Sequence, residues 1–173
     1  MTPLRIGINA SLLLLLFAIQ ETVVSRVHLP FTGFSFYLAC VILLVTLENR
    51  TGAVIIGFTG GIILDLSPSS QSPFGQWALI LTGISYLIAV NAESIDDLVS
   101  RPVGVGIFVA TAATFTLLLY LLMNLLLGEA AGTFGHDFIV IFGNAFWTVL
   151  AAPFLMKPIF GFRNATLGSR DRK

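Results

Sequence analysis

The sequence predicts an all-α membrane protein, a six-transmembrane-helix bundle, from its composition, the length of its apolar runs and the placement of its charges. Of its 173 residues, 56% are hydrophobic and 10% are charged, and the mean hydropathy is +0.94. At roughly 20 residues per span, a chain of this length holds about six spans and no soluble domain. Because no basic stripe or long charged run is present, a nucleic-acid-binding function is excluded.

The apolar runs set the bounds of the expected helices. The predicted spans are 5–25, 33–48, 51–66, 74–92, 102–127 and 138–160. The first continues beyond its apolar run without a small-x-small cleavage site, so we expect it to be retained as a helix. The second and third are separated by one or two residues and must form a tight hairpin. The third rises about 24 Å, less than a hydrocarbon core, which puts Asp65 near an interface.

The last two spans contain prolines that set their expected shape. The fifth begins at Pro102, a position where proline favours a helix start, and it is long enough to tilt. The sixth contains Pro153 and Pro158, which we expect to kink or fray its end. The acidic segment 93–97 between the fourth and fifth spans is expected to be a solvated turn or, as the alternative, a docking point for a partner.

The positions of lysine and arginine predict the orientation of the bundle. With the N-terminus inside, eight of the nine basic residues fall on the cytoplasmic side, and Arg26 falls outside. The eight are Arg5, Arg50, Arg101, Lys157, Arg163, Arg170, Arg172 and Lys173. This asymmetry predicts cytoplasmic N and C termini, with 161–173 as a short basic cytoplasmic tail.

Residues 57–66 (GFTGGIILDL) form the strongest candidate contact site. Gly57, Gly60 and Gly61 remove side-chain bulk from one face of the third helix, so another helix can approach closely. Asp65 lies at the C-terminal end of that helix, where the helix dipole disfavours a carboxylate. We therefore expect Asp65 to face Arg26 or a cation from a partner, and the alternative is an interfacial carboxylate exposed to water and headgroups.

Other polar residues lie within or at the ends of the predicted spans. Gln20 and Thr22 are placed to hydrogen-bond to a neighbouring helix, and Glu21 between them is expected to enter the headgroup region. Asn124 and Asn144 are expected to hold helices together. No helical His-Glu-x-x-His is present, and His28 and His136 fall in predicted outer loops, so no catalytic or metal site is expected.

A wider set of residues connects the chain with a known family. They are Gln20 and Thr22, the run 52–58 (GAVIIGF) leading to 61–66 (GIILDL), then Gly75, Ala78, Leu79 and Pro153. With the chain length, six spans and cytoplasmic termini, this pattern resembles the MreD family of bacterial rod-shape-determining membrane proteins. The fold that this implies is similar to the substrate-binding S-components of energy-coupling-factor transporters, which by itself carries no function.

The resemblance implies a non-catalytic, multi-pass scaffold in the bacterial cytoplasmic (inner) membrane, without a cofactor. Such a protein would bind MreC and, through it, the RodA glycosyltransferase and a penicillin-binding transpeptidase, supporting rod shape and lateral peptidoglycan synthesis. One alternative is a vitamin-type S-component, whose outer-face pocket would use Trp77, Gln76, His136 and Gln20. A weaker alternative is an ion or proton pathway through Asp65 and Glu21.

Overall fold

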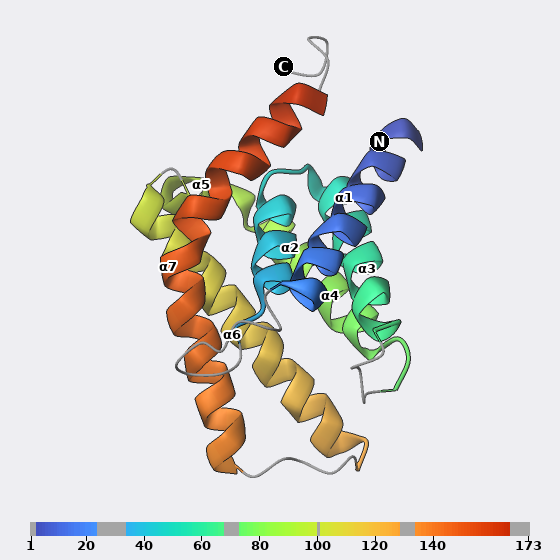
Figure 1. The fold of residues 1–173 in the computed structure, drawn as a ribbon, viewed down its shortest axis with the longest axis vertical. Helices are drawn as coiled ribbons and strands as arrows, with labels where there is room; N and C mark the ends of the chain where they lie inside the picture. Colours follow the sequence, from blue (N-terminus) through green and yellow to red (C-terminus); the bar gives the residue numbers. More distant parts are fainter. Residues whose placement is uncertain (1–2, 24–33, 68–72, 100, 129–133, 167–173) are drawn as a thin grey trace.

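The computed structural model describes residues 3–23, 34–67, 73–99, 101–128 and 134–166, and this part of the chain is all-helical (Figure 1). Its helices are α1 (Pro3–Thr22), α2 (Phe36–Thr46), α3 (Arg50–Asp65), α4 (Gln76–Val90), α5 (Ala92–Val99), α6 (Pro102–Leu126) and α7 (Phe134–Thr166). The prediction of an all-α protein is therefore confirmed. Arg26, His28 and the end of the predicted tail lie outside the described residues.

The short helix α2 forms the centre of the bundle. It contacts α1, α3, α4, α6 and α7, and every residue from Tyr37 to Val45 is buried. This explains why its sequence is apolar on all sides, because a helix enclosed by other helices has no face that meets water. Its 11 residues rise about 16 Å, about half the thickness of a hydrocarbon core.

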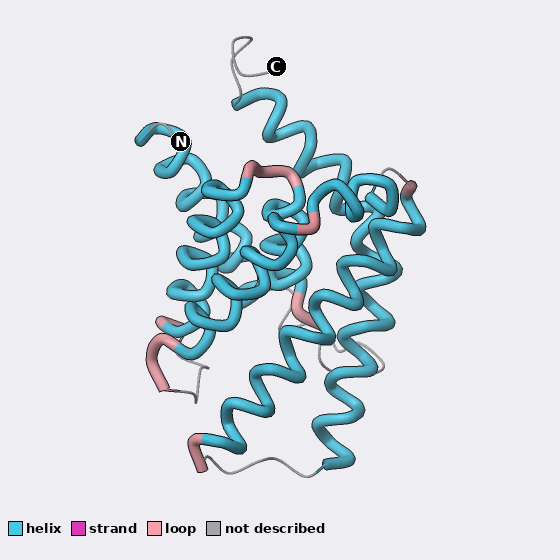
Figure 2. Tube along the Cα trace, turned by 180° about the vertical axis from the view of Figure 1, so that it is seen from behind, coloured by secondary structure: helices cyan, strands magenta, loops and turns pink. Residues whose placement is uncertain are grey.

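Two antiparallel helix pairs pack around α2. The most extensive contacts join α3 to α4 and α6 to α7. The first turn of α1 and the last turn of α7 lie at the same end of the bundle (Figure 1). Seen from behind, α6 and α7 extend beyond the other helices at the opposite end (Figure 2).

The helix starts differ in what their own sequence supplies as a cap. Ser35 Oγ accepts the Leu38 N–H at the start of α2, and Asn49 Oδ1 accepts the Gly52 N–H (2.9 Å) at the start of α3. Pro102 occupies the first turn of α6, as predicted, where its missing N–H costs no hydrogen bond. Gly75, the N-cap of α4, has a φ of 96° and supplies no side-chain cap.

Two sequence predictions about connections are wrong. The segment 93–97, expected to be a turn, is part of the helix α5. Its apolar residues Ile95, Leu98 and Val99 recur at helical spacing, and Glu93 in the first turn favours the positive end of the helix dipole. The predicted end at 160 is also too early, because α7 continues through Pro153 and Pro158 to Thr166. It bends in its upper part (Figure 1) instead of fraying.

Two helices are long and apolar enough to cross a membrane, over Val103–Leu126 in α6 and Gly135–Ile159 in α7. Only 33% and 22% of their most apolar windows are buried inside the protein, whereas the core helix of a soluble protein is mostly buried. Large apolar side chains are also exposed on α4, α6 and α7, including Leu79, Leu126 and Phe154. Such an exterior suits lipid better than water.

Candidate functional site

The glycine face of α3 packs directly against other helices of the same chain. A Cβ at Gly61 would lie 2.6 Å from Ala78 N and 2.6 Å from Trp77 O, and one at Gly57 would lie 2.6 Å from Leu81 O. A larger residue at either position would force the α4 backbone to shift, so the close approach of α4 favours glycine at both. The close packing expected of these glycines is therefore satisfied inside the chain, and α4 covers the surface that a partner would need.

Gly60 faces the central helix instead of α4. A Cβ there would approach Val41 Cγ1 at 3.3 Å and Tyr37 Oη at 3.5 Å, and the Tyr37 hydroxyl donates to the Gly60 carbonyl (3.1 Å). The three glycines thus serve two neighbours, α4 and α2, although the sequence placed them on one contact face.

Asp65 caps the N-terminus of α4. The Trp77 N–H donates to Asp65 Oδ1 (3.0 Å) and the Ala78 N–H donates to Asp65 Oδ2 (3.0 Å), and the carboxylate is half-buried. Because Gly75 offers no side chain, the first N–H groups of α4 need an acceptor from elsewhere. The positive end of the α4 dipole also favours a carboxylate at this place.

This geometry gives Asp65 a partner that the sequence did not predict, and a cationic partner for Asp65 stays a prediction. Both carboxylate oxygens are engaged by backbone N–H groups, so the positive partner is a helix N-terminus. Arg26, the cation expected there, lies outside the described residues. The sequence identified the important carboxylate but did not reveal its bonds to the backbone of α4.

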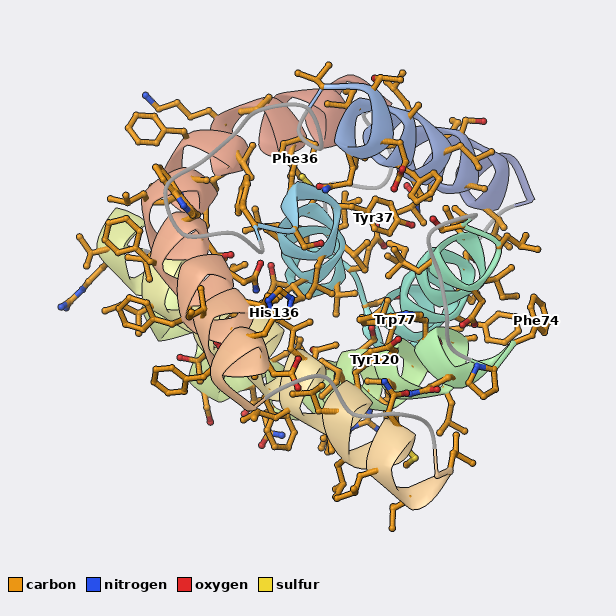
Figure 3. The ribbon with its side chains drawn as sticks, turned by 60° about the horizontal axis from the view of Figure 1, so that its bottom comes forward. Phe36, Tyr37, Phe74, Trp77, Tyr120 and His136 are labelled. Atoms are coloured by element: carbon orange, nitrogen blue, oxygen red, sulfur yellow. The ribbon has the colours of Figure 1, made fainter. Side chains whose placement is uncertain are left out.

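A polar and aromatic cluster continues from this cap towards α6. Gln76 Nε2 donates to Asn124 Oδ1 (2.6 Å) and to the Tyr120 carbonyl (3.2 Å). The Trp77 and Tyr120 rings stack with centroids 4.3 Å apart and an interplanar angle of 16°. Figure 3 shows these two side chains next to each other where α4 meets α6. Asn124 therefore joins two helices, as its position in an apolar span predicted.

The polar residues of α1 have different roles. Gln20 Oε1 accepts the Tyr37 N–H of α2 (3.2 Å), which is the interhelical contact expected of it. The Thr22 hydroxyl is exposed and donates to the Ala18 carbonyl (2.6 Å) of its own helix, so the interhelical bond predicted for Thr22 is wrong. Asn144 of α7 is fully buried, and its Oδ1 accepts the Ser35 N–H (2.9 Å) just before α2.

Sequence reasoning missed the aromatic partners in these contacts. Tyr37 and Tyr120 were not singled out, because an aromatic residue in an apolar span has no pattern that distinguishes a stacking or bonding role. An indirect signal existed for Tyr120, since it lies one helical turn before Asn124 and thus on the same side of α6.

No candidate metal centre is visible in the described part of the chain. No group of three or more His, Cys, Asp or Glu side chains gathers among the described residues. His136 lies in the first turn of α7 and is exposed. The predicted outer loop at this position is therefore helical.

An apolar groove lies on the outside of the hairpin formed by α3 and α4. Its volume is about 820 Å³, and its walls come from α3, α4 and α6. Gly83 lines it, and a Cβ at Gly83 would meet nothing within 4 Å. This side of α4 thus contrasts with its opposite side, where α3 leaves no space.

In the described part of the chain, the fold and these contacts define a helical bundle with an apolar exterior. At the starts of α2 and α4, backbone N–H groups bond to polar side chains of other helices. The chain matches no protein-family model, no curated protein and no solved structure.

Proposed function

We propose that this protein is a non-catalytic membrane scaffold of the MreD type, which supports rod shape by binding MreC in the bacterial cell-elongation complex. The observation that carries the proposal is the structural role of residues 57–66, the segment in which the resemblance to the MreD family is strongest. Gly57, Gly61 and Asp65 bind α3 to α4 through close packing and a helix cap. These residues thus stabilise a pair of helices inside the chain. A stable helix pair suits a scaffold that binds a partner better than it suits chemistry on a substrate.

The proposal includes six membrane spans, with both termini in the cytoplasm of a bacterial inner membrane. It is supported by the eight-to-one distribution of basic residues and by the position of the first and last turns at one end of the bundle (Figure 1). Reporter fusions at residue 173, between α2 and α3, and between α6 and α7 test it. Cytoplasmic signals at the first two sites and an external signal at the third are expected, and any reversed site contradicts the topology.

The partner is tested by purifying the full-length, affinity-tagged chain from membranes of a rod-shaped bacterium. Co-purification of MreC, and through it of RodA and the penicillin-binding transpeptidase, is the expected result. Rounded cells after depletion of the chain, restored by the wild-type protein, provide the functional readout. The proposal is contradicted if cells stay rod-shaped after full depletion. It is also contradicted if the chain is recovered without MreC under conditions that keep MreC bound to RodA and the penicillin-binding transpeptidase.

One observation favours the S-component as the second candidate. Gln76 is 7% exposed and its Oε1 has no hydrogen-bond partner, beside the stacked Trp77 and Tyr120 rings. An amide acceptor next to aromatic rings is the kind of group that orients a small ligand. Co-purification of an ATPase-containing energising module in place of MreC identifies this function.

A further inference from the structure

A second pair of buried polar atoms lies on α7, away from the Asp65 cap. Asn144 and Thr148 both have no exposed surface, and Asn144 Nδ2 and Thr148 Oγ1 have no hydrogen-bond partner. An unpaired polar group buried in apolar surroundings costs about 1–3 kcal/mol. Two such groups one helical turn apart therefore call for a common explanation.

The Asn144 side chain lies beside the start of α2, and Thr148 follows it by one helical turn. Asn144 Oδ1 accepts the Ser35 N–H, which fixes the amide next to the N-cap of α2. Residues four apart on a helix have Cβ atoms roughly 5–6 Å apart, so Thr148 lies on the same face as Asn144. The two atoms are not bonded to each other, since neither has a partner.

Thr148 also differs from other threonines in the helices. Each of the following donates its hydroxyl proton to the carbonyl four residues earlier: Thr22, Thr82, Thr111 and Thr116. Thr116 is as fully buried as Thr148 and makes this bond to the Ala112 carbonyl (2.7 Å). The Thr148 hydroxyl makes no such bond, although burial alone favours it.

We propose that one water molecule binds between Asn144 Nδ2 and Thr148 Oγ1, at the junction of α7 with the start of α2. The water accepts a hydrogen bond from the Asn144 amide and donates one to the Thr148 hydroxyl oxygen. Two to four polar partners are what a buried water requires, and this arrangement provides two of them. A neutral molecule suits the site because no cationic side chain is bonded there and burying an unpaired anion is far more costly.

The bound water has a structural consequence for the centre of the bundle. The Ser35 N–H fixes the Asn144 amide with Oδ1 as its acceptor, which leaves Nδ2 as the buried donor. The water therefore satisfies the donor that this orientation of the amide leaves unpaired. This role does not depend on which partner the protein binds.

The test uses NMR of the full-length chain in lipid bicelles, with the Asn144 side-chain amide protons assigned. A cross-peak of the same sign as a long-lived bound water is expected between these protons and water. Thr148→Val keeps the shape of the side chain and removes the hydroxyl, so we expect the cross-peak to be lost. Thr116→Val is the matched control, equally buried but bonded within its own helix, and should retain it.

Several outcomes overturn the proposal. Absence of the cross-peak in the wild-type chain does so, as does its persistence in Thr148→Val. A high-resolution structure that shows Asn144 Nδ2 bonded directly to protein, or to a bound molecule other than water, does so as well. Because the wild-type measurement stands alone, the proposal stays falsifiable even if the Thr148→Val chain fails to fold.

Discussion

Replacing glycines of the hairpin by alanine tests how closely α3 and α4 approach. At Gly61 the new Cβ would overlap Ala78 Cα and lie 2.6 Å from Ala78 N, so the α4 backbone must move by about an ångström. Overpacking against backbone costs about 3 kcal/mol at the upper end of the usual range, and the higher helix propensity of alanine offsets about 1 kcal/mol. Gly61→Ala should therefore destabilise the protein by about 2 kcal/mol.

Alanine substitutions at two other glycines provide references for the expected loss of stability in Gly61→Ala. A Cβ at Gly83 meets nothing within 4 Å, so Gly83→Ala should leave the stability unchanged or raise it by about 1 kcal/mol through helix propensity alone. Gly60 would meet the Val41 side chain at 3.3 Å, and a side chain can shift by a few tenths of an ångström. Gly60→Ala should therefore lie between the other two variants.

The assay is reversible unfolding of the purified protein in mixed detergent micelles, followed by tryptophan fluorescence and circular dichroism. The expected order of stability is Gly83→Ala, then Gly60→Ala, then Gly61→Ala, with about 3 kcal/mol between the extremes. Equal stabilities of Gly61→Ala and Gly83→Ala would refute the reasoning, because the two changes differ only in the backbone that the new methyl group meets.

Three further experiments test the polar contacts in the same assay. Asp65→Asn should lower the unfolding free energy by about 1–3 kcal/mol, because its amide NH2 would face one of two backbone donors; unchanged stability would contradict the cap. The charge swap Asp65→Arg with Arg26→Asp should be no more stable than Asp65→Arg alone, since a backbone partner cannot be exchanged, and rescue would show an ion pair instead. Gln20→Leu should cost about 1–3 kcal/mol by leaving the Tyr37 N–H unpaired, whereas the matched Thr22→Val should stay within about 0.5 kcal/mol; similar effects would argue against the assigned difference.

The apolar runs predicted the positions of the long helices within a few residues, because burial and lipid exposure both demand uninterrupted apolar sequence. The errors occur where another influence dominates. The helix α5 has only eight residues and mixes charged with apolar side chains, so no hydropathy window reveals it. The end of α7 was predicted too early because the apolar run gives way at residue 161 to a polar, basic segment, although the helix continues into that segment as far as Thr166.

The candidate site was predicted at the level of residues and missed at the level of partners. Asp65 stood out because a carboxylate at the negative end of a helix dipole needs an explanation. A sequence displays side chains, however, and the partners of Asp65 are backbone N–H groups 12 and 13 residues further on. Gly75 was the available clue, since a helix that begins at glycine lacks a cap of its own.

The same reasoning explains why amides occur inside otherwise apolar helices. The central helix α2 is enclosed by five other helices, so the N–H groups at its start are partly shielded from solvent. Gln20 of α1 and Asn144 of α7 supply acceptors to this region, as Asp65 of α3 supplies them to α4. A buried helix start needs acceptors from its own N-cap and from other helices that pack beside it. Polar residues at such positions therefore fix which helices become neighbours, and this is how an apolar sequence specifies one arrangement of its helices.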